Sequence, residues 1–174
     1  STSYFLKMNP VTGEFQETSR IGAQQGSIQA VAVQVTDKHL FAMTRRGGGY
    51  GPETEGYVVR SDSHDGGLTW SEGVDSEFPN PNAAVAMLKL QSGNILLIYN
   101  DSMADRTPLK AALSTDGGKT WAHRTTIMTG NNSFAYPYAI QGAEGTIHLI
   151  FTTDGRSLIH HATFQEADVL EGTM

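Results

Sequence analysis

The sequence contains no cysteine, which excludes a disulfide framework, a thiol nucleophile and a thiolate metal site. It has no run of Lys and Arg, and its formal net charge at pH 7 is −6. Neither nucleic acid nor an anionic membrane surface is therefore expected as a partner. No apolar stretch reaches the roughly 20 residues that span a bilayer. The longest compact run, Ile95 to Tyr99, has the length of a strand.

A charged and apolar signal segment is also missing at the start of the sequence. A processed secreted protein would look the same, so both a secreted and a cytoplasmic location stay open. Helical periodicity is missing as well. The 174 residues are enough for one domain with a hydrophobic core, since domains of this size bury roughly 70% of the surface of the unfolded chain. These features favour a single all-β domain.

An internal repeat is the strongest positive signal in the sequence. The eight residues from 63 to 70 recur, with six positions identical, at residues 114 to 121, which lie 51 residues further on. Five of the identical positions carry the motif Ser-x-Asp-x-Gly-x-Thr-Trp. They are Ser63, Asp65, Gly67, Thr69 and Trp70 in the first copy, and Ser114, Asp116, Gly118, Thr120 and Trp121 in the second.

Pairs of apolar alternating segments, each joined by a short polar turn, accompany the motif. They cover residues 28–35 with 40–44, 84–90 with 95–99, and 136–141 with 147–152. Third strands are predicted at 57–61, 109–114 and 158–164. Units of about 40 to 50 residues with four short strands are typical of propeller blades. A β-sandwich is the main competitor, and the propeller is favoured because one turn motif recurs at one fixed place in each unit.

The chain therefore divides into about three to three and a half blades, fewer than the four to eight of a typical ring. We expect the remnant of a preceding blade at residues 1–25, blades at 26–78, 79–130 and 131–164, and a tail at 165–174. Such a chain would be part of a ring, completed either by a second copy in a homodimer or by an N-terminal half.

The repeated motif has a local physical explanation. Its Asp can accept backbone N–H bonds across the turn, its Gly can adopt the positive φ that the turn requires, and its Trp can bury a large ring between strands. The alternative is that Asp65 and Asp116 are catalytic carboxylates or calcium ligands. Two equivalent copies around a pseudo-symmetric ring would point in different directions, so a structural role is favoured and no metal site is predicted.

The motif matches the Asp box, also called the BNR repeat, and the chain resembles the C-terminal half of sialidase-like (neuraminidase-like) propellers. The resemblance runs from about residue 26 to 164 and includes segments 26–29, 78–82, 99–102 with 106–109, and 134–137. Members of this family are usually six-bladed exo-glycosidases. The resemblance therefore implies a partial six-bladed propeller and a glycoside hydrolase or carbohydrate-binding function, without a cofactor.

The first strand of each blade lines the central funnel of a propeller, so its first residues are candidates for ligand contact. Counting back from the first hairpin turn of each unit places Gln29, Asn82 and Tyr136 on the same strand face. These three side chains should converge. Counting forward places Arg45 where a second strand ends, and Arg106 follows the second strand of the next unit. Residues that differ between equivalent positions suit a single off-centre ligand.

The resemblance implies roles for several of these residues. Three arginines clamp the substrate carboxylate in sialidases, and Arg45 (or its neighbour Arg46) and Arg106 resemble the second and third of them. Tyr136 resembles the tyrosine nucleophile. Gln29 stands at the position of the expected glutamate base, although an amide cannot take a proton. The first arginine and the aspartate acid/base would belong to the N-terminal half.

Other interpretations of these residues stay open. Tyr136 can be a packed strand residue, Arg106 a solvated loop charge, and Arg45 with Arg46 part of an exposed loop. Asn80 and Asn82 can be turn formers, although their place at a strand entry favours ligand binding. The leading hypothesis is a sialidase-like exo-glycosidase, or its C-terminal part, that acts on a terminal sugar. An acidic sugar is one candidate. The alternatives are a non-catalytic glycan-binding fragment and a purely structural module.

Overall fold

The computed structural model describes residues 1–48 and 56–174, and within these ranges the chain is almost entirely β-structure. One antiparallel sheet has the order β3 (Ser27–Gln34), β4 (Leu40–Arg46), β5 (Tyr57–Ser63) and β6 (Val74–Pro79). A second sheet repeats this order with β7 (Ala86–Lys89), β8 (Ile95–Asn100), β9 (Leu109–Ser114) and β10 (His123–Met128). The expected four-stranded units are confirmed.

The two ends of the chain add smaller sheets. At the N-terminal end, β1 (Leu6–Met8) pairs with β2 (Phe15–Glu17). At the C-terminal end, β11 (Ala135–Gln141), β12 (Ile147–Thr153) and β13 (Leu158–Phe164) form a three-stranded sheet, with a 3-10 turn at Asp154–Arg156 between β12 and β13. In the described ranges, no helix is long and apolar enough to cross a membrane.

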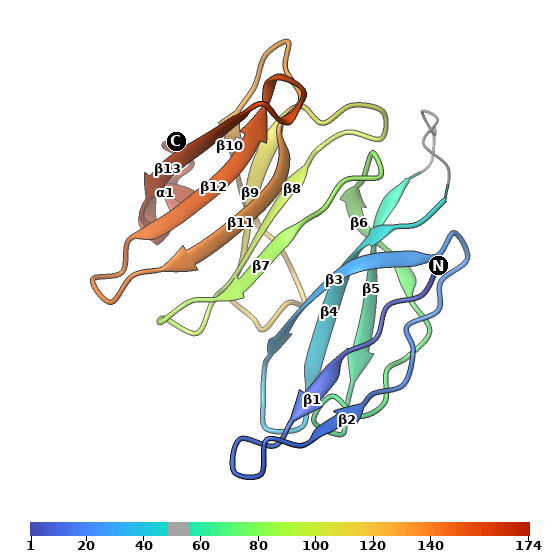
Figure 1. Ribbon diagram of the computed structural model, residues 1–174. Coiled ribbons are helices and arrows are strands. Elements are labelled where there is room, and N and C mark those ends of the chain that lie inside the picture. Colours follow the sequence, from blue (N-terminus) through green and yellow to red (C-terminus); the bar gives the residue numbers. More distant parts are fainter. Residues whose placement is uncertain (49–55) are drawn as a thin grey trace.

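The sheets follow one another in chain order, and the first strands β3, β7 and β11 lie next to each other (Figure 1). Each hydrophobic core lies between two neighbouring sheets rather than inside one. The side chains of Phe41, Met43 and Leu97 share the core between the first two sheets. Leu96 and Phe151 share the core between the second and third. Successive side chains of a strand point to opposite faces of the sheet, and here both faces carry apolar residues. Each sheet therefore needs a neighbour on either side.

Both copies of the repeated motif form the same hydrogen-bonded turn. The Oδ1 atom of Asp65 accepts bonds from the backbone N–H groups of Leu68 (3.0 Å) and Thr69 (2.9 Å), and Oδ2 accepts from the Thr69 hydroxyl (2.6 Å). Asp116 makes the equivalent three bonds with the same lengths. The ring of Trp121 is buried against Phe78, with ring centroids 5.3 Å apart. The turns therefore hold the third and fourth strands together and place the Trp between sheets.

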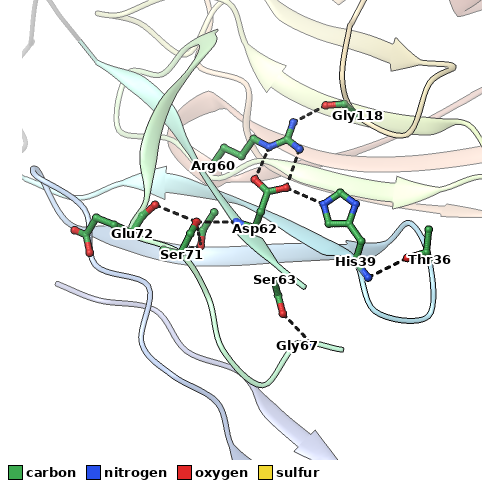
Figure 2. Close-up of polar contacts among 10 residues, drawn as sticks. Thr36, His39, Arg60, Asp62, Ser63, Gly67, Ser71, Glu72 and Gly118 are labelled. Atoms are coloured by element: carbon green, nitrogen blue, oxygen red, sulfur yellow. Dashed lines mark hydrogen bonds and ion pairs between the residues drawn. The ribbon is translucent and has the colours of Figure 1, made fainter. Parts of the chain in front are cut away.

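A cluster of charged side chains links the sheet β3–β6 to the second Asp-box turn, at residues 114–121 (Figure 2). The guanidinium of Arg60 donates two hydrogen bonds of 2.9 Å to the carboxylate of Asp62, and it also donates to the carbonyl of Gly118. His39 approaches the same carboxylate at 2.9 Å. Burial raises the pKa of Asp62, but the hydrogen bonds from Arg60 and His39 outweigh it and lower that pKa. The carboxylate thus stays ionised and orients Arg60 toward the neighbouring sheet.

Residues 165–174 were expected to be a tail, but they contain the short helix α1 (Glu166–Glu171). Its Val169 side chain is 1% exposed and belongs to the core between the second and third sheets. The carboxylate of Asp168 accepts a 2.7 Å bond from the backbone N–H of Gln165 at the start of the helix. The segment therefore covers one end of this core, against β9 and β10.

Candidate functional site

Three residues with left-handed backbone mark one end of the first strands. Gln29, Asn82 and Tyr136 have φ values of 52°, 55° and 53°, respectively. In β3 and β11 the pairing register with the second strand shifts around this residue, which is the pattern of a β-bulge. A left-handed conformation costs most residues other than Gly about 1–2 kcal/mol, and Asn and Asp adopt it more readily than the rest. Its repetition at three equivalent positions indicates a shared constraint that re-aims these side chains.

Arg45 connects the first two of these residues. It lies at the end of β4, where its backbone pairs with Ile28 of β3. Its Nε donates a 2.6 Å hydrogen bond to Oδ1 of Asn82, and its Nη1 donates a 2.9 Å bond to Oε1 of Gln29. The side chain is only 6% exposed, and a buried guanidinium requires such acceptors. Arg45 thereby links the start of β3 to the segment just before β7 in the neighbouring sheet.

Arg106 approaches the same place from the loop between β8 and β9. Its Nη2 donates a 3.1 Å hydrogen bond to the backbone carbonyl of Asn82, and its Cζ lies 5.4 Å from the ring centroid of Tyr136. Its own carbonyl accepts a 2.8 Å bond from the backbone N–H of Phe134, just before β11. The loop is therefore fixed at both its side chain and its backbone.

A further arginine, Arg156, lies beside the same ring, with its Cζ 5.4 Å from the centroid of Tyr136. The pKa of the Tyr136 phenol is lowered, first by a hydrogen bond from Arg106, against the opposing effect of desolvation. The charges of Arg156 and Arg106 and a hydrogen bond from Arg45 lower this pKa further. The arrangement stabilises a phenolate, or another anion that takes its place.

Three of these residues, Asn82, Arg106 and Arg156, line a cleft of about 600 Å³, which is the size of a small-molecule site. Its walls are residues 81–82, 104–107 and 131–133, together with Arg156. Asp105 is the only acidic residue among the described residues of this lining, so the cleft is basic and polar. Across residues 1–48 and 56–174, no group of three or more His, Asp or Glu side chains is arranged to hold a metal ion. The chemistry available here is hydrogen bonding, anion binding and attack by a phenol.

Two residues expected at the site lie elsewhere. Asn80 is fully buried, and its side chain bonds to the backbone N–H (3.0 Å) and carbonyl (2.8 Å) of Ala83. It therefore shapes the turn before β7 and does not face the cleft. Arg46 follows Arg45 in β4 and so points to the other face of the sheet, where it donates to Oε1 of Gln25. Of the two neighbouring arginines, Arg45 is the one directed toward Gln29 and Asn82.

The sequence reasoning missed Arg156 as a site residue. The signal that could have indicated it is positional, because each unit has an arginine at or after the end of its second strand. Arg45 and Arg46 end β4, Arg106 follows β8, and Arg156 follows β12. Without the turn geometry, nothing distinguishes Arg156 from an exposed loop charge.

Repeated four-stranded sheets that pack face to face, with Asp-box turns at one end and a polar cleft at the other, define an Asp-box β-propeller. The profile of the BNR repeat-like domain matches residues 4–149 of the chain. The chain belongs to this sialidase-like BNR-repeat family. A search of curated proteins finds no significant match.

Solved structures with the same fold include several glycoside-processing enzymes. The intramolecular trans-sialidase from Ruminococcus gnavus, in complex with oseltamivir carboxylate, is 18% identical, with a TM-score of 0.74 over 95% of this chain and 38% of that one. The NanB sialidase from Streptococcus pneumoniae is 16% identical, with a TM-score of 0.78 over 97% of this chain and 28% of that one. The GH93 α-L-arabinofuranosidase of Fusarium graminearum, in complex with arabinobiose, is 17% identical, with a TM-score of 0.61 over 80% and 45%.

At these identities the likeness establishes the fold alone, which is that of several blades of a sialidase-type β-propeller. The chain spans 28% to 45% of the length of these three proteins.

Proposed function

We propose that the chain carries the tyrosine- and arginine-bearing part of a sialidase-like exo-glycosidase site that binds a terminal acidic sugar. The observation that carries this proposal is the convergence of Arg45 and Arg106 on Asn82, next to Tyr136, at a polar cleft. The side chains come from three separate units of the propeller. Their convergence is not required for packing, since hydrophobic cores already join the sheets.

An anionic ligand suits the charge of this cleft. A guanidinium presents a planar fork of donors that matches a carboxylate, and such charge-assisted pairs are the strong hydrogen bonds of proteins. Arg106 faces the cleft and Arg45 lies behind Asn82. In this arrangement Arg106 contacts the ligand directly, while Arg45 fixes the side chain of Asn82 and adds positive charge.

Tyr136 fits the role of a nucleophile toward such a sugar. A carboxylate nucleophile would repel an anionic substrate, whereas a phenol is neutral until it is activated, and sialidases are the known exception that uses tyrosine. The nearby arginines lower the pKa of the phenol and so favour the attacking form. The same positive charge would therefore serve both binding and activation.

A second candidate function is glycan binding without catalysis, and Gln29 favours it. Its Oε1 accepts a bond from Arg45, and an amide cannot take the phenol proton as a glutamate would. The aspartate that would act as acid/base in the family has no counterpart recognised in this sequence. We therefore expect the isolated chain to bind an acidic sugar and to hydrolyse little or none of its glycosides.

The test uses the pure chain with a panel of aryl glycosides that includes a sialoside and an α-L-arabinofuranoside, with calorimetric binding of the free sugars in parallel. Binding of N-acetylneuraminic acid without turnover is the expected result. Turnover of the sialoside that vanishes in Tyr136→Phe would refute the expected lack of hydrolysis and support the enzyme. Failure to bind the acidic sugar would contradict the proposed site.

We also propose that the outer face of the third sheet is covered by further propeller blades. Tyr138 and Ile150 pair across β11 and β12, and Ile159 pairs with Thr152 on the same face. All three apolar side chains are exposed, Ile159 by 75%. A patch of this kind marks an association surface. For the chain on its own, a second copy is the proposed occupant. Light scattering should give a dimer mass, and a monomer at micromolar concentration would contradict it.

A further inference from the structure

The resemblance to sialidases assigns no role to Arg156, although it lies at the cleft. Its side chain is exposed, lines the cleft and lies 5.4 Å from the centroid of the Tyr136 ring. Arg106 lines the same cleft at the same distance from that ring. Two guanidinium groups from different blades thus flank one phenol. An anion held by one of them would also interact with the other.

The backbone around Arg156 is set in an unusual conformation. Asp154, Gly155 and Arg156 have φ values of 49°, 64° and 77°, so three consecutive residues are left-handed. For Asp154 and Arg156 this conformation is costly and needs support from the surrounding structure. The turn follows β12 directly, so its geometry decides where the Arg156 side chain goes.

Asn132, which also lines the cleft, provides that support from the segment before β11. Its Nδ2 donates a 2.8 Å bond to Oδ1 of Asp154, and its Oδ1 accepts a 3.1 Å bond from the backbone N–H of Asp154. The Asp154 carbonyl accepts a 2.8 Å bond from the hydroxyl of Ser157. The carboxylate beside Arg156 is therefore engaged by an amide. Within residues 1–48 and 56–174, no carboxylate forms an ion pair with Arg156.

We propose that Arg156 is a specificity-determining residue that, together with Arg106, holds the ionised group of an acidic sugar next to Tyr136. This inference rests on the proposed function for the identity of the ligand, and on the geometry of the turn for the position of the charge. Asn132 acts as a positioning residue because its side chain bonds to Asp154 and so fixes the turn that carries Arg156. The cleft then selects acidic over neutral sugars with two cations that this chain supplies by itself.

The test compares N-acetylneuraminic acid with its methyl ester, which keeps the sugar ring and its other substituents but carries a methyl group in place of the negative charge. In Arg156→Gln the affinity for the acid should fall by roughly fivefold, the scale of a solvent-exposed charge pair, while the affinity for the ester stays unchanged. Arg156→Lys should retain part of the preference for the acid. Equal affinity of Arg156→Gln and the wild type for the acid would overturn the inference and leave the proposed function intact.

Arg20 offers a matched control, because its Cζ lies 5.2 Å from the ring centroid of Tyr4, away from the cleft. Arg20→Gln should change neither affinity. A second measurement does not depend on a sugar: the absorbance titration of Tyr136, taken as the difference between each protein and its Tyr136→Phe counterpart. Its midpoint should rise in Arg156→Gln and not in Arg20→Gln. If the wild type binds no sugar, the proposed function fails. Independently of that result, an unchanged Tyr136 midpoint in Arg156→Gln would overturn the inference about Arg156.

Discussion

The two ends of the blades use the left-handed backbone in opposite ways. At the Asp-box end, the left-handed residues of the two turns are glycines, including Gly67 (φ 88°) and Gly118 (φ 83°), and the motif residues are the same in both copies. At the cleft end, the entry to the first strand of each unit has a left-handed residue other than glycine, and this residue differs between units: Gln29, Asn82 and Tyr136. Where only a turn is needed, the cheapest residue occupies it. Where a residue with a strained backbone differs between units, its side chain rather than the turn explains why it is there.

Pairing register shows that these are opposite ends of the same strands. Ile28 pairs with Arg45 at the cleft end, and Leu40 pairs with Ser63 at the Asp-box end. Because the sheets are joined mainly by their cores and Asp-box contacts, changes at the two ends should have separable effects. Asp-box variants should alter stability, and cleft variants should alter ligand binding.

The largest effect is expected from Trp121→Ala. The ring is buried against Phe78 in the core between two sheets, so its loss should reduce the free energy of unfolding by about 3–5 kcal/mol. Denaturant unfolding measures this change, and Val74→Ala on the exposed face of β6 serves as a control with little effect. A wild-type unfolding curve for Trp121→Ala would remove the packing argument.

Gly118→Ala should be the next most destabilising change. A Cβ atom at this left-handed position would lie 2.5 Å from two ring atoms of Phe41. Conformational strain and overpacking together should lower the free energy of unfolding by about 2–4 kcal/mol. Gly93→Ala is a matched control, since Gly93 is left-handed (φ 92°) with no atom within 4 Å of its added Cβ. If both variants lose the same stability, contact with Phe41 plays no part.

A smaller effect is expected from acid. The Thr69 hydroxyl and backbone N–H lower the pKa of Asp65 from 3.8 to about 2, and the Thr120 hydroxyl and N–H lower that of Asp116 as well. A lowered pKa means that the stabilisation is present above about pH 4 and is lost as the pH falls toward 2. The melting temperature should therefore drop over this range. The double variant Asp65→Asn with Asp116→Asn should melt lower at pH 5 and show a flatter pH dependence, whereas parallel curves would argue against these turns.

The smallest effect on stability is expected at the cleft, from Gln29→Gly. Glycine relieves the left-handed strain but loses the bond to Arg45 and makes the unfolded chain more flexible, so the contributions nearly cancel. The free energy of unfolding should change by less than about 1 kcal/mol. A loss as large as that of Gly118→Ala in the same denaturant experiment would mean that the cleft end also maintains the fold.

The fold was predictable because its signals are local and repeated. Alternating apolar residues and the Asp-box motif define strands and turns without reference to distant contacts. Helix α1 was not predictable in this way, since it has only six residues and depends on the burial of Val169 in a core between two sheets. Asn80 was expected to bind a ligand, but its amide is fully buried and bonded to Ala83. The sequence alone does not reveal this burial.

The candidate site was predictable in part for the same reason. Counting from the hairpin turns located Gln29, Asn82 and Tyr136, because the register of a hairpin fixes which residues share an end of the sheet. Arg156 could not be found by counting. Its position depends on the left-handed turn after β12 and on the bonds between Asn132 and Asp154, which are 22 residues apart.

The central claim is that the Asp boxes maintain the fold while the varied left-handed positions and their arginines bind the ligand. The most direct test is the dissociation constant for N-acetylneuraminic acid, measured well below the melting temperature for the wild type, Asp116→Ala and Arg106→Gln. Asp116→Ala should bind as tightly as the wild type although it melts lower. Arg106→Gln loses a side-chain bond to the Asn82 carbonyl, so it should melt closer to the wild type than Asp116→Ala does but bind more weakly. Weakened binding by folded Asp116→Ala together with unchanged binding by Arg106→Gln would contradict this account.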